Sequence, residues 1–406
     1  MITANGFRSP DDSACEVFMS DPSAVKAALK SQVIETPSWG YGNSGTRFKV
    51  FAQPGVPRDP FEKLQDAAQV HAFTGVAPKV SLHIPWDGVD DYTELARYAA
   101  DLGLRIGAIN ANVFQDDDFK LGSVTHPDPK VRRKATDHLL ECVGIMGETG
   151  SADLKLWFAD GTNYPGQDDI VGRQDRLAEA LAEVYGQLGD GQRMLLEYKL
   201  FEPAFYTTDV PDWGTAYAHC LHLGPKAQVV VDTGHHAPGT NIEFIVAFLL
   251  RAGRLGAFDL NSRFYADDDL MAGAADPFQL FRIMHEVVKN RGLEPGTNVN
   301  FMLDQCHNIE AKIPAVIRSV TNVQEATAKA LLVDRDALGE AQRSGDVLAA
   351  HGVLMDAYNT DVRPLLAEVR SELGLAQDPF AAYLTSGHQE RIAAARVGGD
   401  QAGWGA

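Results

Sequence analysis

Seven potential metal ligands lie in the second half of the chain, and most of them stand at the ends of short apolar runs. They are six carboxylates and one imidazole: Glu197, Asp232, His235, Asp259, Asp267, Asp269 and Asp304. Four runs typical of β-strands, at 194–199, 228–235, 255–261 and 299–304, each carry one of these acids at or near the end. Like charges gathered at one point repel, and some would have to stay protonated. One or two divalent cations would remove that conflict, so the pattern predicts a metal site.

Two loop motifs could supply ligands to a pair of cations. In Asp232-x-x-His235 a carboxylate closes a strand and an imidazole follows, so Asp232 could bridge two cations while His235 binds one of them. In the acidic run Asp267–Asp269 the outer two carboxylates could bind the second cation and Asp268 would face water; a solvated loop is the ordinary alternative. Oxygen-rich ligation with an imidazole suits Mn²⁺ or Mg²⁺, or Co²⁺ in vitro, and without a thiolate ligand a structural zinc site is not expected.

Further residues could handle a substrate. Glu197 and Lys199 share one side of a strand, so that Lys199 could polarise or protonate a substrate oxygen; an ion pair is the ordinary alternative. His83 ends the run 79–84 and could bond a substrate hydroxyl or ring oxygen, with Asp87 fixing its tautomer. Two tryptophans, unless they are core residues, offer flat faces of the kind that stack on sugar C–H surfaces: Trp86 and Trp157.

Strands and helices alternate along the chain from about residue 46. Eight segments are typical of strands: 47–51, 79–84, 104–110, 153–159 and the four acidic runs. Helical apolar spacing occurs at 61–73, 91–103, 130–150 and 172–189. This alternation predicts an α/β fold of the (β/α)₈ TIM-barrel type, in which active sites lie at the carboxyl ends of the strands. A doubly wound sheet is the alternative, but no GxGxxG follows a strand.

The ends of the chain differ from its centre. Pro22 is expected in the first turn of a helix through VKAALKSQ (25–32), with Ser20 or Asp21 as its cap. Residues 323–395 carry no strand signal and are largely helical. We therefore predict an N-terminal segment (1–45), a barrel with the metal site (46–322) and a C-terminal helical extension (323–406).

Composition and charge limit the classes of partner. A formal net charge of −19 repels phosphate backbones, so nucleic acid is not expected as a partner. The four cysteines are scattered without a CxxC, which argues against a zinc ribbon or a disulfide framework and fits a reducing cytoplasm. The N-terminus has no apolar signal core, and the apolar run IVAFLL (245–250) is too short to cross a bilayer. We expect a cytoplasmic protein without a membrane partner.

Six longer motifs follow one another along the chain. They are HIPWD (83–87), KLGSVTHPDP (120–129), LWFADGTNYPGQ (156–167), LEYK (196–199), VVVDTGHHAPGTNIE (229–243) and FYADDDL (264–270). With the candidate ligands they make the chain resemble L-rhamnose isomerases, within the xylose-isomerase-like barrel superfamily. The resemblance covers most of the chain, from SWGYGNSGTRF (38–48) to DQCHNIEAKIPAVI (304–317).

The resemblance implies two divalent cations per subunit, with Mn²⁺ expected ahead of Mg²⁺ or Co²⁺, and a homotetramer. The ligands of a first, structural cation would be Glu197, Asp232, Asp259 and Asp304. The ligands of a second, catalytic cation would be Asp232, His235, Asp267 and Asp269, so that Asp232 is shared. No nucleotide or flavin cofactor is expected.

The resemblance also implies roles around a monosaccharide substrate. Residues expected to take part in catalysis are Lys199, His83 and Asp304. Residues expected to contact the sugar are Trp157, Trp86, Trp39, Phe48 and Asp267. Trp39 and Phe48 would lie near the methyl end of the sugar, and Phe48 could reach the site of a neighbouring subunit. Two positions depart from the pattern. Asp259 stands where L-rhamnose isomerases usually have His, and an Asp there resembles xylose isomerases; Cys306 stands where Ser is common.

The implied reaction interconverts L-rhamnose and L-rhamnulose. The ring opens with help from His83 or a nearby acid, and a hydrogen moves between C2 and C1 as a metal-assisted hydride shift; proton transfer through an enediol is the alternative. Other interpretations are an isomerase of another aldose or a rare ketose, a metal-dependent phosphodiesterase, and a barrel without activity. A phosphodiesterase would want more histidines at strand ends and a basic groove.

Overall fold

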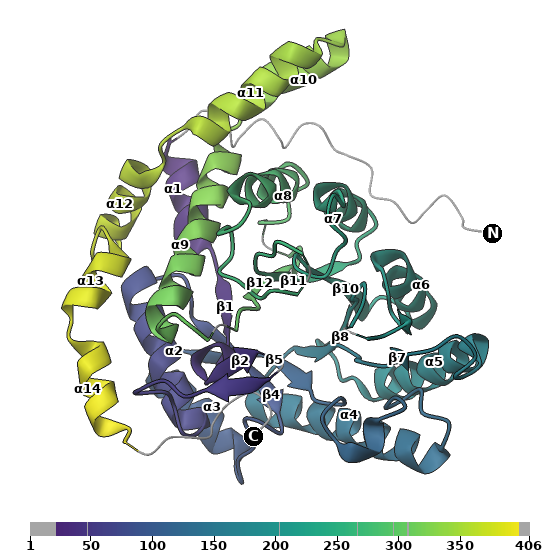
Figure 1. Ribbon diagram of the computed structural model, residues 1–406. Coiled ribbons are helices and arrows are strands. Elements are labelled where there is room, and N and C mark those ends of the chain that lie inside the picture. Colours follow the sequence, from purple (N-terminus) through teal and green to yellow (C-terminus); the bar gives the residue numbers. More distant parts are fainter. Residues whose placement is uncertain are drawn as a thin grey trace.

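Eight parallel strands close on themselves at the centre of the protein, with helices around them (Figure 1). The computed structural model describes residues 22–46, 48–202, 204–265, 267–294, 296–306 and 308–397. Within these ranges the order around the barrel is β1-β12-β11-β10-β8-β6-β5-β4. The strands are β1 (Ile34–Pro37), β4 (Lys79–Ile84), β5 (Arg105–Ala111), β6 (Asp153–Leu156), β8 (Arg193–Glu197), β10 (Ala227–Asp232), β11 (Leu255–Leu260) and β12 (Asn300–Leu303). The predicted (β/α)₈ barrel is confirmed.

Helices α2 to α9 alternate with the strands and pack on the outside of the barrel. They are α2 (Pro60–Thr74), α3 (Tyr92–Asp101), α4 (Pro129–Thr149), α5 (Ile170–Gln187), α6 (Trp213–Leu223), α7 (Ile242–Arg251), α8 (Pro277–Lys289) and α9 (Lys312–Leu331). In α2 to α8 an Asp or Asn side chain accepts a backbone N–H of the first turn: Asp59, Asp91, Asp128, Asp169, Asp212, Asn241 and Asp276. Each such cap stabilises its helix by ~0.5–2 kcal/mol relative to alanine. Part of the acidity of the chain therefore serves helix starts rather than the site.

The barrel begins earlier in the chain than the sequence predicts. The prediction that 47–51 forms the first barrel strand is wrong. The first barrel strand is β1, which pairs with β12 and β4. Residues 49–51 form β3 (Lys49–Phe51), which pairs with β2 (Ser44–Thr46) in a hairpin outside the barrel. All of β1 is buried, and the strand is too short to show an alternation of apolar and polar residues. The sequence of the exposed hairpin does alternate between apolar and polar residues, as that of a half-buried strand would. The barrel thus starts within the range predicted as an N-terminal segment. The division of the chain into three parts stays a prediction.

Further helices lie at both ends of the chain. The predicted helix at Pro22 is confirmed as α1 (Pro22–Ser31), while its proposed caps, Ser20 and Asp21, lie outside the described residues. The predicted C-terminal helices are also confirmed: α10 (Arg335–Ser344), α11 (Val347–Asn359), α12 (Arg363–Glu372), α13 (Pro379–Thr385) and α14 (His388–Ala395). In Figure 1, α12 to α14 run along one flank of the barrel, where α13 packs on α9 and α2, and α10 and α11 extend away from it.

Several short elements complete the fold. They are the pair β7 (Gly161–Thr162) and β9 (Thr207–Thr208), with the 3₁₀ turns η2 (Ser38–Tyr41) and η3 (Asp117–Phe119). No helix among the described residues combines the length and the hydropathy that crossing a bilayer requires.

Candidate active site

The register of the strands brings the predicted acids to one level of the barrel. Asp232, the last residue of β10, lies beside Asp259 of β11. Glu197 ends β8 next to β10, and Asp304 directly follows β12. Each of these strands is mainly apolar, and its acid lies at the last residue of the strand or within one residue of it. The carboxylates therefore meet at the C-terminal end of the barrel, where enzymes of this fold carry their active sites.

Two groups of potential ligand atoms result, and they share two carboxylates. In each group every residue offers one atom that lies within 4.8 Å of all the others. The first group is Glu197, Asp232, Asp259 and Asp304, and the second group is Glu197, Asp232 and His235. All are buried except Asp304, which is partly exposed. Oxygen ligands bind Mg²⁺ or Ca²⁺ at about 2.0–2.6 Å, so atoms this close together fit one divalent cation in each group.

Burial shifts the pKa values of these acids apart. Burial raises the pKa of Asp232 to about 7 and that of Asp259 well above its usual range. Burial also acts to raise the pKa of Glu197, but Lys155 and His235 offset it and lower the value to about 2. Some carboxylates are thus protonated at neutral pH without a cation. A bound cation would let them ionise, because it supplies the missing positive charge.

A lysine outside the sequence-based site lies among the carboxylates. Nζ of Lys155 contacts Asp259 and lies 3.5 Å from Oε2 of Glu197. Burial lowers the pKa of Lys155, but the carboxylates of Asp259, Glu197 and Asp304 together raise it above its usual value, so the amine is charged. The sequence did carry a signal for Lys155. It stands two residues before Trp157 in the predicted strand 153–159, so the two side chains are expected to face the same side.

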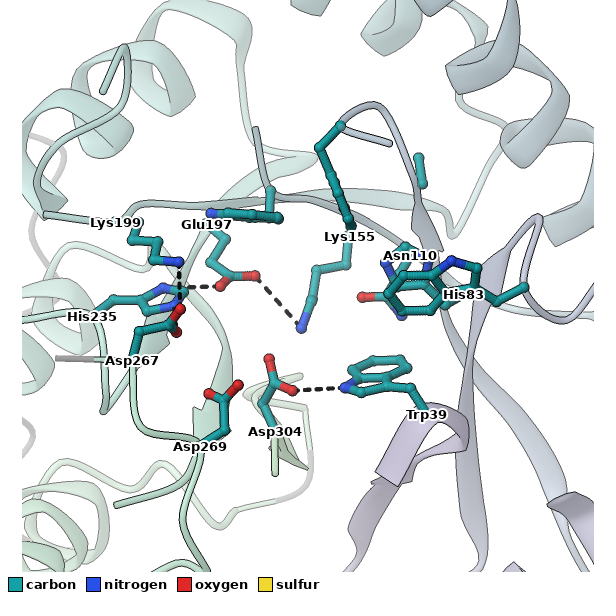
Figure 2. A pocket seen from close by; sticks show the side chains of 14 residues that line it. Trp39, His83, Asn110, Lys155, Glu197, Lys199, His235, Asp267, Asp269 and Asp304 are labelled. Atoms are coloured by element: carbon teal, nitrogen blue, oxygen red, sulfur yellow. Dashed lines mark hydrogen bonds and ion pairs between the residues drawn. The ribbon is translucent and has the colours of Figure 1, made fainter. Parts of the chain in front are cut away.

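His235 connects the second group to the loop after β11. Its Nδ1 lies 3.1 Å from Oε1 of Glu197, and its Nε2 lies 2.8 Å from Oδ1 of Asp267. Lys199 contacts the other oxygen of Asp267, and also Glu202. Lys199, Asp267 and His235 thus form a connected polar cluster on one side of the cavity (Figure 2).

The loop after β11 holds two aspartates in the left-handed backbone region. Asp267 has φ 53° and Asp269 has φ 47°, a region that aspartate enters more readily than most residues. A backbone bond of 3.2 Å from the N–H of Asp267 to the carbonyl of Gly234 ties this loop to the loop of His235. Asp268, expected to face water, is partly exposed and accepts the N–H groups of residues 264 and 265. The loop aims Asp267 and Asp269 into the cavity, although neither belongs to the two ligand groups.

Most predicted site residues line one open cavity. They are Trp39, His83, Trp86, Trp157, Glu197, Lys199, His235, Asp267, Asp269 and Asp304. Four lining residues lie outside the sequence-based site: Asn110, Ala111, Phe114 and Lys155. Phe114 follows β5 and carried no signal, because an apolar residue after a strand is more often part of the core.

The side of the cavity facing His235 and Asp267 is aromatic (Figure 2). The rings of His83 and Trp86 stack with centroids 3.8 Å apart, and Phe114 meets His83 and Trp157 edge-on. Trp39 stands at right angles to His83, with centroids 5.5 Å apart. A carboxylate-rich side facing an aromatic wall suits a ligand with many hydroxyls and apolar C–H faces.

Of two further expectations, that for Phe48 stays untested and that for Asp87 differs from the structure. Phe48 is 81% exposed on the β2–β3 hairpin and does not line the cavity of its own chain, so its sugar contact stays a prediction about a neighbouring subunit. Asp87 does not fix the tautomer of His83: it accepts the backbone N–H of His83 at 2.7 Å and contacts Lys63 and Ser38. Asp87 thus positions the end of β4, while Nδ1 of His83 has no hydrogen-bond partner among the described residues.

Comparisons with known proteins bear on the family. No family model matches the chain. A probable sugar isomerase of Rhizobium meliloti (strain 1021) is 44% identical over 386 residues, which are 93% of this chain and 89% of that protein. The xylose isomerase of Thermus thermophilus is 30% identical over 260 residues, 56% of this chain and 65% of that protein. The L-rhamnose isomerase of Salmonella paratyphi B is 24% identical over 249 residues, 57% of this chain and 55% of that protein.

A solved structure of L-ribulose 3-epimerase superposes with a TM-score of 0.57 at 14% identity, covering 75% of this chain and 98% of that chain. At this identity the likeness shows the fold alone. The match to the Rhizobium protein runs along nearly the whole of both chains, through the strands that carry the acids. From its length and its identity we conclude that this chain belongs to the sugar isomerase family.

Proposed function

We propose that the protein is a metal-dependent aldose–ketose isomerase that interconverts L-rhamnose and L-rhamnulose. The observation that carries the proposal is that two groups of ligand atoms share Glu197 and Asp232. Shared carboxylates would hold two cations close enough to reach neighbouring oxygens of one sugar. The facing wall of His83, Trp86 and Phe114 supports a sugar as the ligand.

Two divalent cations per subunit, most readily Mn²⁺, are part of the proposal. The first group would hold one. Asp232 and His235 of the second group would hold the other together with Asp267 and Asp269, so that Asp232 bridges the two cations while Glu197 binds the first. Oxygen ligands with one imidazole favour Mn²⁺, Mg²⁺ or Co²⁺. When bound, such cations act as Lewis acids on the oxygens at C1 and C2 of the sugar.

Two side chains of the cavity would handle protons. Burial lowers the pKa of Lys199, but Asp267 and Glu202 raise it above its usual value, so Lys199 stays charged and can donate to a developing alkoxide. Burial lowers the pKa of His83 well below its usual value. The neutral ring, with Nδ1 unpaired among the described residues, can accept a proton or a hydrogen bond during ring opening.

L-rhamnose is proposed as the substrate because the family resemblance points to it and L-rhamnose isomerases are among the relatives. The aromatic wall suits the apolar methyl group of a 6-deoxy sugar. D-xylose is the first competitor, because a xylose isomerase is also among the relatives. We propose a hydride shift between C2 and C1, with proton transfer through an enediol as the alternative.

The test begins with protein stripped by a chelator and reloaded with Mn²⁺. Ketose formation is measured from L-rhamnose, D-xylose, L-mannose, D-allose and D-ribose, with a phosphodiester as control substrate. Mn²⁺-dependent turnover that is fastest with L-rhamnose supports the proposal. Faster turnover of another aldose would support the proposed reaction and change the proposed substrate. Turnover of the phosphodiester alone would refute the proposed isomerase activity. Assays in D₂O separate the two routes, since a hydride shift leaves the carbon atoms of the product free of deuterium from the solvent.

We also propose a homotetramer in the cytoplasm. Support comes from apolar side chains exposed on projecting elements, Phe48 and Phe51 on the hairpin and Val347 and Leu348 on α11. Exposed apolar side chains that gather into one patch mark interaction surfaces. Light scattering during size-exclusion chromatography gives the mass, and a monomer would contradict this part of the proposal.

A further inference from the structure

Lys155 occupies the first group of carboxylates. It is 5% exposed, its Nζ contacts Asp259 and lies 3.5 Å from Oε2 of Glu197, and it lies 5.6 Å from the ring centroid of Trp39. Figure 2 shows its side chain reaching across the cavity toward Glu197. A positive charge of the chain itself thus lies beside two of the four carboxylates that would bind the first cation.

We propose that Lys155 is a tethered cation that competes with a divalent cation for Glu197 and Asp259, so that the first group binds its cation more weakly than the second group. The first group then fills last. The inference rests on the proposed function, because it takes both groups to be cation sites.

The competition follows from the positions of the atoms. A cation bound to carboxylates needs their oxygens at about 2.0–2.6 Å. Lys155 draws on the same two side chains, and an ammonium and a divalent cation this close would repel strongly in a buried site. Binding in the first group therefore requires Lys155 to leave Asp259. Since Lys155 lines the cavity, it can turn into the space where the sugar would bind.

The ammonium does not satisfy the first group completely, so a divalent cation can still displace it. Oδ1 of Asp259 is buried without a hydrogen-bond partner among the described residues. One positive charge also faces four carboxylates, whereas a divalent cation brings two charges that all four ligands can share. Lys155 thus weakens the binding of a cation to the first group but does not prevent it.

Lys155 bears less on the second group than on the first. Of the three members of the second group only Glu197 lies near Lys155, at 3.5 Å, whereas Asp259, which belongs to the first group alone, is in direct contact with it. Lys199, the other ammonium of the cavity, contacts Asp267, a proposed ligand of the second cation, but it also pairs with Glu202 outside the site. Two classes of Mn²⁺ affinity are therefore expected, with Lys155 as the cause of the weaker class.

The test is a calorimetric Mn²⁺ titration of chelator-stripped protein at one buffered pH. Wild type is expected to show two classes of site. In Lys155→Met the affinity of the weaker class should rise by about tenfold or more, since a competing charge has been removed. Lys199→Met, the matched control, should leave the weaker class within about twofold. Wild type binding one cation and Lys155→Met binding two would also support competition.

Unchanged or weaker Mn²⁺ binding in Lys155→Met would overturn the inference and leave the isomerase proposal standing. Absence of Mn²⁺ binding by wild type would instead refute the metal part of the proposed function. A crystal structure of wild type saturated with Mn²⁺ gives a second measurement that does not depend on the folding of Lys155→Met. Anomalous scattering locates Mn²⁺, and Lys155 should then be out of contact with Asp259. Mn²⁺ in the first group with that contact intact would overturn the inference.

Discussion

Nε1 of Trp39 donates a hydrogen bond of 2.8 Å to Oδ1 of Asp304. Trp39 lies in η2 directly after β1, and Asp304 directly follows β12. These two strands come from opposite ends of the barrel sequence and pair where the barrel closes. The bond sets the orientation of one carboxylate of the first group, so barrel closure and ligand placement depend on the same contact.

Trp39→Phe removes this bond and keeps an aromatic ring at the cavity. A hydrogen bond to a charged group is worth about 1.5–3 kcal/mol, so kcat/KM should fall by about 10- to 100-fold. The matched control is Trp86→Phe, which loses a bond of 2.6 Å to the neutral side chain of Gln115. An equal loss in both variants would argue that ring packing, rather than orientation of Asp304, is what matters.

Asp232→Asn tests the shared ligand. The fold should persist, because Asn keeps the shape of the side chain and can still pair with Asn261, which bonds Asp232 at 3.0 Å. Turnover should be abolished, since both ligand groups lose one carboxylate. Sugar turnover and circular dichroism are measured on the same sample. Retained activity in a folded variant would remove Asp232 from its bridging role.

The affinity for Mn²⁺ should depend on pH through Asp232. Burial raises the pKa of Asp232 to about 7 in the cation-free protein, and a cation binds the ionised form. Protonation of Asp232 should therefore lower the affinity by up to about tenfold per pH unit below pH 7. Titrations in buffers of different ionisation enthalpy count the protons released. Equal affinity one unit above and one unit below pH 7 would contradict this assignment.

Stability should fall in mild acid because of His285 in α8. Burial, aided by Arg335 and Lys289, lowers the pKa of His285 to about 3, whereas an unfolded histidine titrates near ~6.5. The folded pKa is the lower one, so the contribution of His285 to stability is full above ~6.5 and is lost as the pH falls toward 3. At pH 5 the loss is ~2 kcal/mol.

Urea unfolding in chelator at pH 7 and pH 5 measures this loss. His285→Gln should show a smaller decrease than wild type, by ~2 kcal/mol. The same substitution at His351, an exposed residue of α11, is the control and should leave the decrease unchanged. If His285→Gln lost as much stability as wild type between the two pH values, another group would have to be responsible.

The sequence by itself determined the barrel and the position of its acids. Apolar runs ending on Glu197, Asp232 and Asp259 have the length of buried strands, and parallel strands must present their carboxyl ends on one side. The first strand, β1, was not predicted because it is short and contains the acid Glu35. Inside the barrel Glu35 accepts a hydrogen bond of 2.6 Å from the N–H of Ala108. A hydropathy pattern cannot show that a buried acid has such a partner.

Only the tertiary structure decided which charges meet. Lys155 and Asp259 are separated by 104 residues, and Trp39 and Asp304 by 265, so no local pattern relates them. Their contacts follow from the register of the strands and the closure of the barrel, which depend on the packing of the whole chain. The sequence therefore determined which ligands are available, and the closed barrel decided that an ammonium lies among them, because strand pairing brings distant residues to one point.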